Sequence, residues 1–161
     1  MDQTSKHVLD TQQVEIIGRS FLLSCCIADG VEVAQPIRDK GIDLIIFNDI
    51  SDQQLFISVP IQLKAASKAN FSINKKYAKI PNLLMAYVWH SADPIKARLF
   101  LLTYADVELL ATKLGWLTTR SWIDNGFYST QNPSKKLTEM LSSYEYSPGS
   151  ISRLVLASYA N

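Results

Sequence analysis

Gln62 and Lys64 are the residues whose type and spacing first indicate chemistry. From Leu55 to Lys64, apolar residues occupy every second position, which is the period of a β-strand, so Gln62 and Lys64 share one face. An amide and an ammonium group at the end of a strand with an apolar opposite face are costly unless they bind something. We therefore expect both side chains to belong to a polar site.

Asp43 is the first candidate partner for that site. It stands second in a predicted strand from Ile42 to Phe47 whose other residues are apolar, so its carboxylate carries a large desolvation cost. A nearby cation would offset this cost. Alternatively, Asp43 caps the turn at Lys40 and Gly41 through hydrogen bonds to the backbone. The sequence leaves both roles open.

Glu15 is a second candidate carboxylate, and it lies in a predicted helix over residues 11–28. The core-facing stripe of this helix is expected to consist of Val14, Ile17, Phe21, Cys25 and Ala28. Glu15 stands at the edge of that arc, which places it at the rim between helix and sheet. The alternative is an ordinary surface ion pair with Arg19 one turn later.

Positive charge is concentrated just after the strand that carries Gln62 and Lys64. The segment between Asp52 and Asp93 contains no carboxylate, and beyond Lys64 it contains Lys68, Lys75, Lys76 and Lys79. Such a cluster can bind a polyanion even though the formal net charge is only +1, because only the facing surface matters. The alternative is a solvated helix and loop.

Elements of alternating type are expected to position these side chains. Extended segments are predicted at residues 31–37, 42–47, 55–64, 83–89 and 98–103, and helices at 11–28, 104–114 and 134–144. Turns are predicted at residues 39–41 and 48–54, and a further helix in the basic connection after Lys64. Ser134 is a suitable N-cap. The tail after Gly149 fits no single type. Predicted helices and strands therefore alternate along the chain.

Composition and absent motifs narrow the function. A chain of 161 residues with 47% hydrophobic residues predicts one folded domain. The longest apolar run, Leu83 to Trp89, is too short for a membrane span of about 20 residues, so a cytoplasmic protein without a membrane is expected. Cys25 and Cys26 lack disulfide or zinc spacing and are expected to be buried. The common motifs of NTPases, dinucleotide-binding proteins, zinc proteases and serine hydrolases do not occur.

The ordered residues resemble the PD-(D/E)XK nuclease superfamily. Glu15 on an opening helix, Asp43 after Gly41, and Gln62-x-Lys64 on the following strand match its motif order over about residues 11–110. The resemblance implies a restriction-endonuclease-like α/β fold, with a mixed β-sheet flanked by helices. It implies a single domain over residues 1–161 with a C-terminal helical extension at about 111–161. Gln62 replaces the usual acidic residue, as in small intron-encoded homing endonucleases. Pro60 within the motif strand suggests a bulge or an unpaired position.

This resemblance implies a metal-dependent endonuclease that hydrolyses phosphodiester bonds in DNA, with duplex DNA as the expected partner. Glu15, Asp43 and Gln62 would bind Mg²⁺ or Mn²⁺. Lys64 would orient the attacking water and stabilise developing charge. Because Gln62 lacks the charge of a glutamate, Glu15 becomes more important. The residues expected to hold the phosphate backbone are Lys68, Lys75, Lys76 and Lys79.

A second hypothesis is a catalytically inactive module of the same fold that binds nucleic acid or assembles with a partner protein. The first helix carries a second apolar strip, formed by Ile16, Leu23 and Ile27. Either the C-terminal helix or a second subunit is expected to cover it. A homodimer or higher oligomer would also suit a nuclease that cuts both strands of a duplex. Trp116 to Gln131 is expected to form a loop that sets substrate choice.

Overall fold

Residues 8–38, 40–50 and 55–159 are described in the structure, which is a computed structural model. The α-helices are α1 (Thr11–Ala28), α2 (Tyr104–Lys113), α3 (Arg120–Asn125), α4 (Lys135–Leu141) and α5 (Ser150–Tyr159). The strands are β1 (Glu32–Ala34), β2 (Leu44–Ile50), β3 (Leu55–Ala65), β4 (Phe71–Asn74), β5 (Leu84–Trp89), β6 (Arg98–Thr103) and β7 (Phe127–Thr130). Short 3-10 helices are η2 (Lys75–Lys79), η3 (Trp116–Thr118) and η4 (Ser142–Tyr144).

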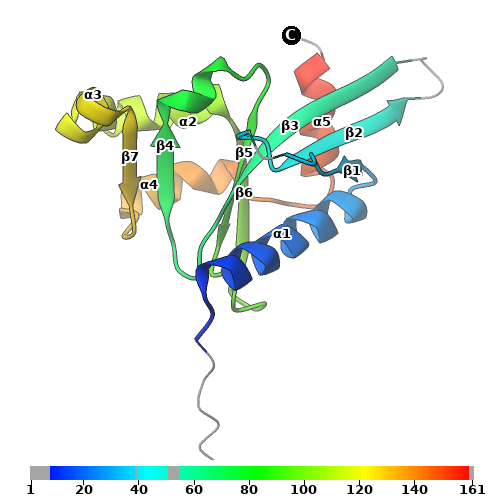
Figure 1. Ribbon diagram of the computed structural model, residues 1–161, viewed down its shortest axis with the longest axis horizontal. Coiled ribbons are helices and arrows are strands. Elements are labelled where there is room, and N and C mark those ends of the chain that lie inside the picture. Colours follow the sequence, from blue (N-terminus) through cyan, green and yellow to red (C-terminus); the bar gives the residue numbers. More distant parts are fainter. Residues whose placement is uncertain (1–7, 39, 51–54, 160–161) are drawn as a thin grey trace, which may run out of the picture.

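The main sheet has the strand order β1-β2-β3-β5-β6. β3 and β5 run parallel, whereas the other neighbouring pairs in this sheet are antiparallel. The chain crosses from β3 to β5 through β4 and η2, and β4 pairs with β7 in a separate two-stranded sheet (Figure 1). A parallel pair needs such a long connection. The predicted α/β class with a mixed sheet and flanking helices is confirmed.

Two apolar layers cover the two faces of the main sheet. α1 and α5 pack on one face, where Leu22 and Val155 meet the buried side chains of β3. α2, α4 and the β4–β7 pair lie toward the other face, where Phe71 stacks on Tyr87 of β5 and Leu137 belongs to the same buried cluster (Figure 1). Alternation along β3 points Leu63 toward the first layer and therefore turns Gln62 and Lys64 toward the second.

The buried stripe of α1 differs from the predicted one. It consists of Val14, Gly18, Leu22, Cys25 and Cys26. Ile17 is 36% exposed, and Ala28 is also exposed. The helix is rotated because Gly18 faces Ala65 at the end of β3, and a Cβ atom on Gly18 would overlap the Cβ of Ala65. Cys25 and Cys26 are buried as predicted, and burial raises their pKa values to about 11 and about 12.

The second apolar strip of α1 is not covered by the C-terminal helix. Ile16 is 63% exposed and Ile27 is 70% exposed, while Leu23 packs partly against the core. α5 lies on β3 and β2 instead. Its N-terminus is held by Asp29, whose carboxylate accepts hydrogen bonds from the backbone N–H groups of Gly149 (2.7 Å) and Ile151 (2.8 Å). The segment after Gly149, for which the sequence predicted no single type of structure, is the helix α5.

Two predicted connections are regular structure. The basic connection after Lys64 is not an α-helix but strand β4 followed by the 3-10 helix η2. Residues 116–131 do not form a loop, because η3, α3 and β7 occupy most of them. β4 and β7 pair with each other, and Trp116 stacks on Tyr128 with ring centroids 4.5 Å apart. Partners this distant in sequence leave little local signal.

The predicted turns are described only in part. β2 continues to Ile50, so residues 48–50 of the predicted turn belong to this strand, and residues 51–54 lie outside the described residues, as does Asp39. Pro60 does not create a bulge, because the β2–β3 register runs continuously through the pair Ile45 and Pro60. It lies outside the pairing of β3 with β5, which starts at Ile61. In the described part of the chain, every helix is too short or too polar to cross a membrane.

Candidate functional site

The pairing of β2 with β3 places Asp43 beside Gln62. Asp43 comes one residue before β2, not within the strand as predicted, and its backbone N–H donates to the carbonyl of Ile61 (2.8 Å). Its carboxylate oxygen Oδ2 accepts hydrogen bonds from the backbone N–H of Leu63 (2.7 Å) and from Nε2 of Gln62. The end of β3 thus holds the Asp43 carboxylate in one orientation.

The side-chain oxygen of Gln62 has no protein partner among the described residues. Gln62 is only 6% exposed, and its Nε2 group also donates to the carbonyl of Leu63 (3.1 Å). Its Oε1 atom is buried and accepts no hydrogen bond there. A buried acceptor without a donor costs about 1–3 kcal/mol. An amide oxygen is also a good ligand for a hard cation such as Mg²⁺.

Lys64 is held by Tyr77, a residue that the sequence analysis did not identify. The Nζ atom of Lys64 donates to the Tyr77 hydroxyl (3.1 Å) and lies 5.3 Å from the ring centroid. Tyr77 is 3% exposed and belongs to η2, and Lys76 Nζ lies 4.9 Å from the same ring. The available signal was one aromatic residue inside the lysine-rich segment Lys75–Lys79.

Glu15 forms the ion pair with Arg19 that the sequence offered as the alternative to metal binding, and it also lines the site. The Glu15 carboxylate lies 2.5 Å from Arg19 Nη2, and its side chain is 54% exposed. Gly18, one turn along α1, allows the helix to approach Ala65, which directly follows Lys64. The close packing of Gly18 on Ala65 therefore sets the distance between Glu15 and the end of β3.

One cavity of about 410 Å³ brings the predicted residues together. Its lining includes Glu15, Asp43, Gln62 and Lys64, together with Tyr77. Within the described ranges, no cluster of three or more His, Cys, Asp or Glu residues could hold a metal ion. The available donors are therefore two carboxylates and the buried amide oxygen of Gln62. Such an oxygen set fits Mg²⁺, which retains several waters and needs few carboxylates.

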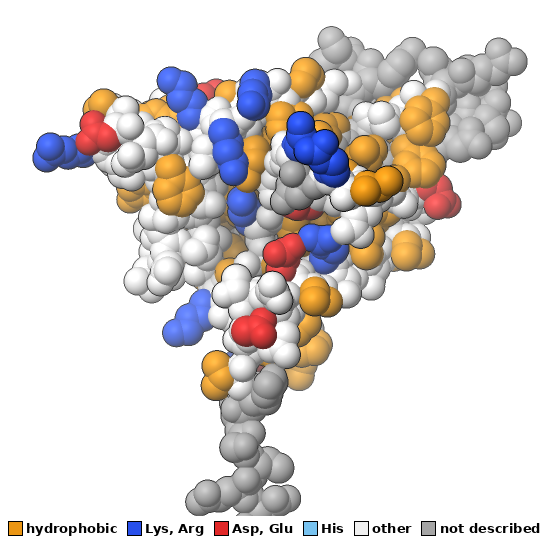
Figure 2. Space-filling model, in the orientation of Figure 1, with side chains coloured by type: hydrophobic (Ala, Val, Ile, Leu, Met, Phe, Trp, Pro, Cys, Tyr) orange, Lys and Arg blue, Asp and Glu red, His pale blue; other side chains and the backbone are white. Residues whose placement is uncertain are grey.

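The predicted backbone-binding lysines occupy different places around this cavity. Lys76 lines it directly, Lys79 lines a neighbouring cavity, and Lys68 lines another. Lys75 lines none of these cavities. Its backbone N–H donates to the carbonyl of Gly126 (2.7 Å), and its side-chain stem lies against that glycine. Figure 2 shows several Lys and Arg side chains on this face, over β4 and η2.

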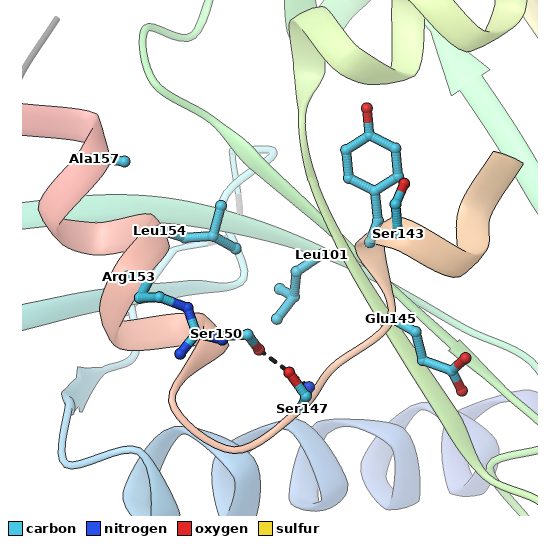
Figure 3. Close-up of a pocket in the computed structure, with 9 residues that line it drawn as sticks. Leu101, Ser143, Glu145, Ser147, Ser150, Arg153, Leu154 and Ala157 are labelled. Carbon is cyan, nitrogen blue, oxygen red and sulfur yellow. Dashed lines mark hydrogen bonds between the residues drawn. The ribbon is translucent and has the colours of Figure 1, made fainter.

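A separate cavity of about 320 Å³ lies between α5 and the segment after η4. Figure 3 shows Glu145 pointing away from Arg153 in this cavity, and a hydrogen bond from the backbone N–H of Ser147 to Ser150 Oγ. The Glu145 carboxylate is already engaged by two 2.7 Å hydrogen bonds from Arg98. This engagement raises the pKa of Arg98 and lowers the pKa of Glu145. We assign a structural role to this ion pair.

Comparisons with known proteins bear on the fold. No protein-family model matches the chain, and no curated protein matches its sequence. A solved structure, the bacterial homing endonuclease I-Ssp6803I, is similar with a TM-score of 0.52 and 11% sequence identity. The match covers 95% of this chain and 96% of that chain. The similarity over nearly the whole of both chains supports a restriction-endonuclease-like fold for this chain, with a five-stranded mixed sheet and flanking helices.

Proposed function

We propose that this protein is a metal-dependent endonuclease that hydrolyses phosphodiester bonds in DNA. The observation that supports the proposal most strongly is the buried Oε1 atom of Gln62, which accepts no hydrogen bond from the described residues. Gln62 lines a cavity that is also lined by Asp43, Glu15 and Lys64. A hard cation would supply the missing interaction. A cytoplasmic location, where DNA is accessible, accompanies this proposal.

Three residues would hold the metal ion in this proposal. Asp43 and Glu15 would contribute carboxylate oxygens, and Gln62 would contribute its amide oxygen. Mg²⁺, or Mn²⁺, would neutralise charge on the phosphate and lower the pKa of a water molecule. Asp43 is already oriented by the backbone of Leu63. Glu15 shares its carboxylate with Arg19, so Arg19 competes for this ligand.

Lys64 would stabilise the negative charge that develops on the phosphate. Its ammonium group has three N–H donors, of which one is used by the Tyr77 hydroxyl. The remaining donors are available to a phosphate oxygen or to the attacking water. Because the Tyr77 ring is buried, its hydroxyl fixes the position of Lys64 Nζ before substrate binds. Preorganised charge of this kind is usually a large part of catalysis.

Cleavage of a supercoiled plasmid tests this function. The assay would compare the wild-type protein with Asp43→Ala and Lys64→Ala in Mg²⁺, in Mn²⁺ and in EDTA. We expect the wild type to nick or linearise the plasmid only with metal, and both variants to be at least about 100-fold slower. Lys113→Ala is the control, since Lys113 is an exposed lysine on the last turn of α2. Equal cutting by all proteins would indicate a contaminating nuclease.

The hydrogen bond from Gln62 to Asp43 favours a second candidate function. It satisfies part of the Asp43 carboxylate without a metal, as expected if the fold has lost catalysis and retained binding. The second candidate is therefore an inactive module that binds DNA or a partner protein. The exposed Ile16 and Ile27 on α1 would suit a homodimer or another partner. This candidate would be favoured if the wild-type protein binds DNA but cuts no plasmid in Mg²⁺ or in Mn²⁺.

A further inference from the structure

The cavity of the proposed nuclease site is the middle of a longer depression. A second cavity of about 410 Å³ shares Ala66 and Asn70 with it and is also lined by Lys68, Gln131 and Asn132. A third cavity of about 110 Å³ shares Gly41, Lys76 and Tyr77 with it and is also lined by Lys40 and Lys79. We call these three neighbouring cavities the groove. Their shared lining residues place them next to one another, with the proposed site in the middle.

Charge along the groove is arranged for a polyanion. Among the described residues that line the two outer cavities, the charged ones are lysines: Lys68 at one end, and Lys40, Lys76 and Lys79 at the other. The carboxylates of Glu15 and Asp43 occur only in the middle cavity, where the metal would bind. A phosphate chain along this path would meet cations on both sides of the site.

The end near Lys68 also presents amide side chains. Gln131 and Asn132 follow β7, and β7 pairs with β4, so the two-stranded sheet carries them to the groove. The backbone N–H of Asn132 donates to Thr130 Oγ1 (3.2 Å), which holds the turn. Both amides are exposed, and each offers donors and acceptors that suit sugar, phosphate or base edges.

We propose that one strand of duplex DNA lies along the groove, from Lys79 past Lys64 to Lys68, and that Gln131 and Asn132 hydrogen-bond to it. The inference rests on the proposed function and extends it by assigning the strand path. It gives the β4–β7 pair a role in contacting substrate. It also separates Lys75, whose stem lies against Gly126 outside the groove, from the neighbouring lysines.

DNA binding measured without hydrolysis tests the strand path. A fluorescein-labelled duplex would be titrated in Ca²⁺ at several salt concentrations, with fluorescence anisotropy as the readout. The proteins are wild type, Lys68→Ala, Lys79→Ala and the matched control Lys75→Ala. We expect each groove variant to bind about five- to tenfold more weakly near 0.1 M salt, and to lower the salt slope by about 1. Lys75→Ala should retain the wild-type slope.

The amide contacts have a different signature. Gln131→Ala/Asn132→Ala removes hydrogen bonds but no charge, so affinity should fall while the salt slope stays at the wild-type value. Asn125→Ala, an exposed amide at the end of α3, is the control and should bind normally. Circular dichroism would confirm that each variant is folded.

The outcomes separate this inference from the proposed function. Wild-type affinity and slope for Lys68→Ala, or an equal loss for Lys75→Ala, would overturn the strand path even if the protein cuts DNA. The predicted pattern together with no cleavage in Mg²⁺ would support the strand path and contradict the nuclease activity. A wild type that does not bind the duplex would overturn both.

Discussion

Gln62 donates its side-chain N–H to the carboxylate of Asp43, while its own side-chain oxygen is buried without a donor among the described residues. The amide therefore stabilises the Asp43 carboxylate next to the end of β3. It lowers the cost of placing Asp43 in the site, since the hydrogen bond to a charged group is worth about 1.5–3 kcal/mol. The remaining oxygen still suits a cation.

Replacing Gln62 by glutamate should make the fold depend on metal. Without metal, Gln62→Glu exchanges a hydrogen bond to Asp43 for repulsion between carboxylates, and we expect a loss of about 2 kcal/mol in the free energy of unfolding. Mg²⁺ should restore more stability to this variant than to wild type, because the site gains a negative charge. Thermal unfolding with and without Mg²⁺ measures this. Gln12→Glu on the exposed part of α1 is the control, and an identical metal effect in both variants would contradict the metal site.

Gly18→Ala should weaken both the fold and the site. Alanine favours helix over glycine by about 1 kcal/mol, but a Cβ at Gly18 would overlap that of Ala65. We expect the overlap to win, with a net loss of about 1–3 kcal/mol, and α1 to move away together with Glu15. Urea unfolding and plasmid cleavage would measure the two effects. Ser20→Ala, on the exposed side of the helix, should be close to neutral. A stabilised Gly18→Ala protein would contradict the close packing.

The Arg98–Glu145 pair should stabilise the protein at neutral pH and not in acid. Hydrogen bonds from Arg98 lower the pKa of Glu145 below its ordinary value. The stabilisation is therefore complete above the unfolded-state pKa and is lost as pH falls through the lower folded-state pKa. Since both side chains are 35% exposed, we expect Glu145→Gln to cost about 1 kcal/mol near neutral pH.

Urea unfolding at neutral and acid pH would measure this difference. The unfolding curves of wild type and Glu145→Gln should converge in acid, once the carboxylate of the wild type is protonated. Glu139→Gln is the control, because Glu139 is 67% exposed and 3.8 Å from its lysine partner. A cost for Glu145→Gln that does not change with pH would show that the ion pair is not its source.

Cys25 and Cys26 should resist thiol reagents in the folded protein. Burial raises their pKa values to about 11 and about 12, so little thiolate exists at mildly alkaline pH, and access is blocked as well. Reaction with dithionitrobenzoate should be slow until urea unfolds the chain. Fast modification of either thiol in the native state would show that α1 opens locally.

The sequence predicted those features that depend on local pattern. Both ends of α1 and of β6 match the structure, because apolar spacing is a local property of the chain. The alternation of β3 placed Gln62 and Lys64 on one face, and the register of β2 with β3 brings Asp43 beside them.

Features that depend on distant contacts were not predicted. Tyr77 holds Lys64 because η2 packs beside the end of β3. A tyrosine in a lysine-rich segment does not by itself predict such a contact. The rotation of α1 depends on the small residue Gly18, which faces Ala65. The spacing of hydrophobic residues in the sequence does not reveal this contact. The pairing of β4 with β7 joins segments far apart in the chain, so the local patterns favoured a helix and a loop.

The position of a bound metal ion tests the central claim most directly. Crystals of the protein grown with Mn²⁺ would be measured for anomalous scattering at the manganese edge. We predict one strong peak beside Asp43 and Oε1 of Gln62, with metal–oxygen distances of about 2 Å. This peak should be absent in Asp43→Ala. The proposed metal site would be contradicted if crystals at saturating Mn²⁺ show no peak between these side chains. It would also be contradicted if the peak remains in Asp43→Ala.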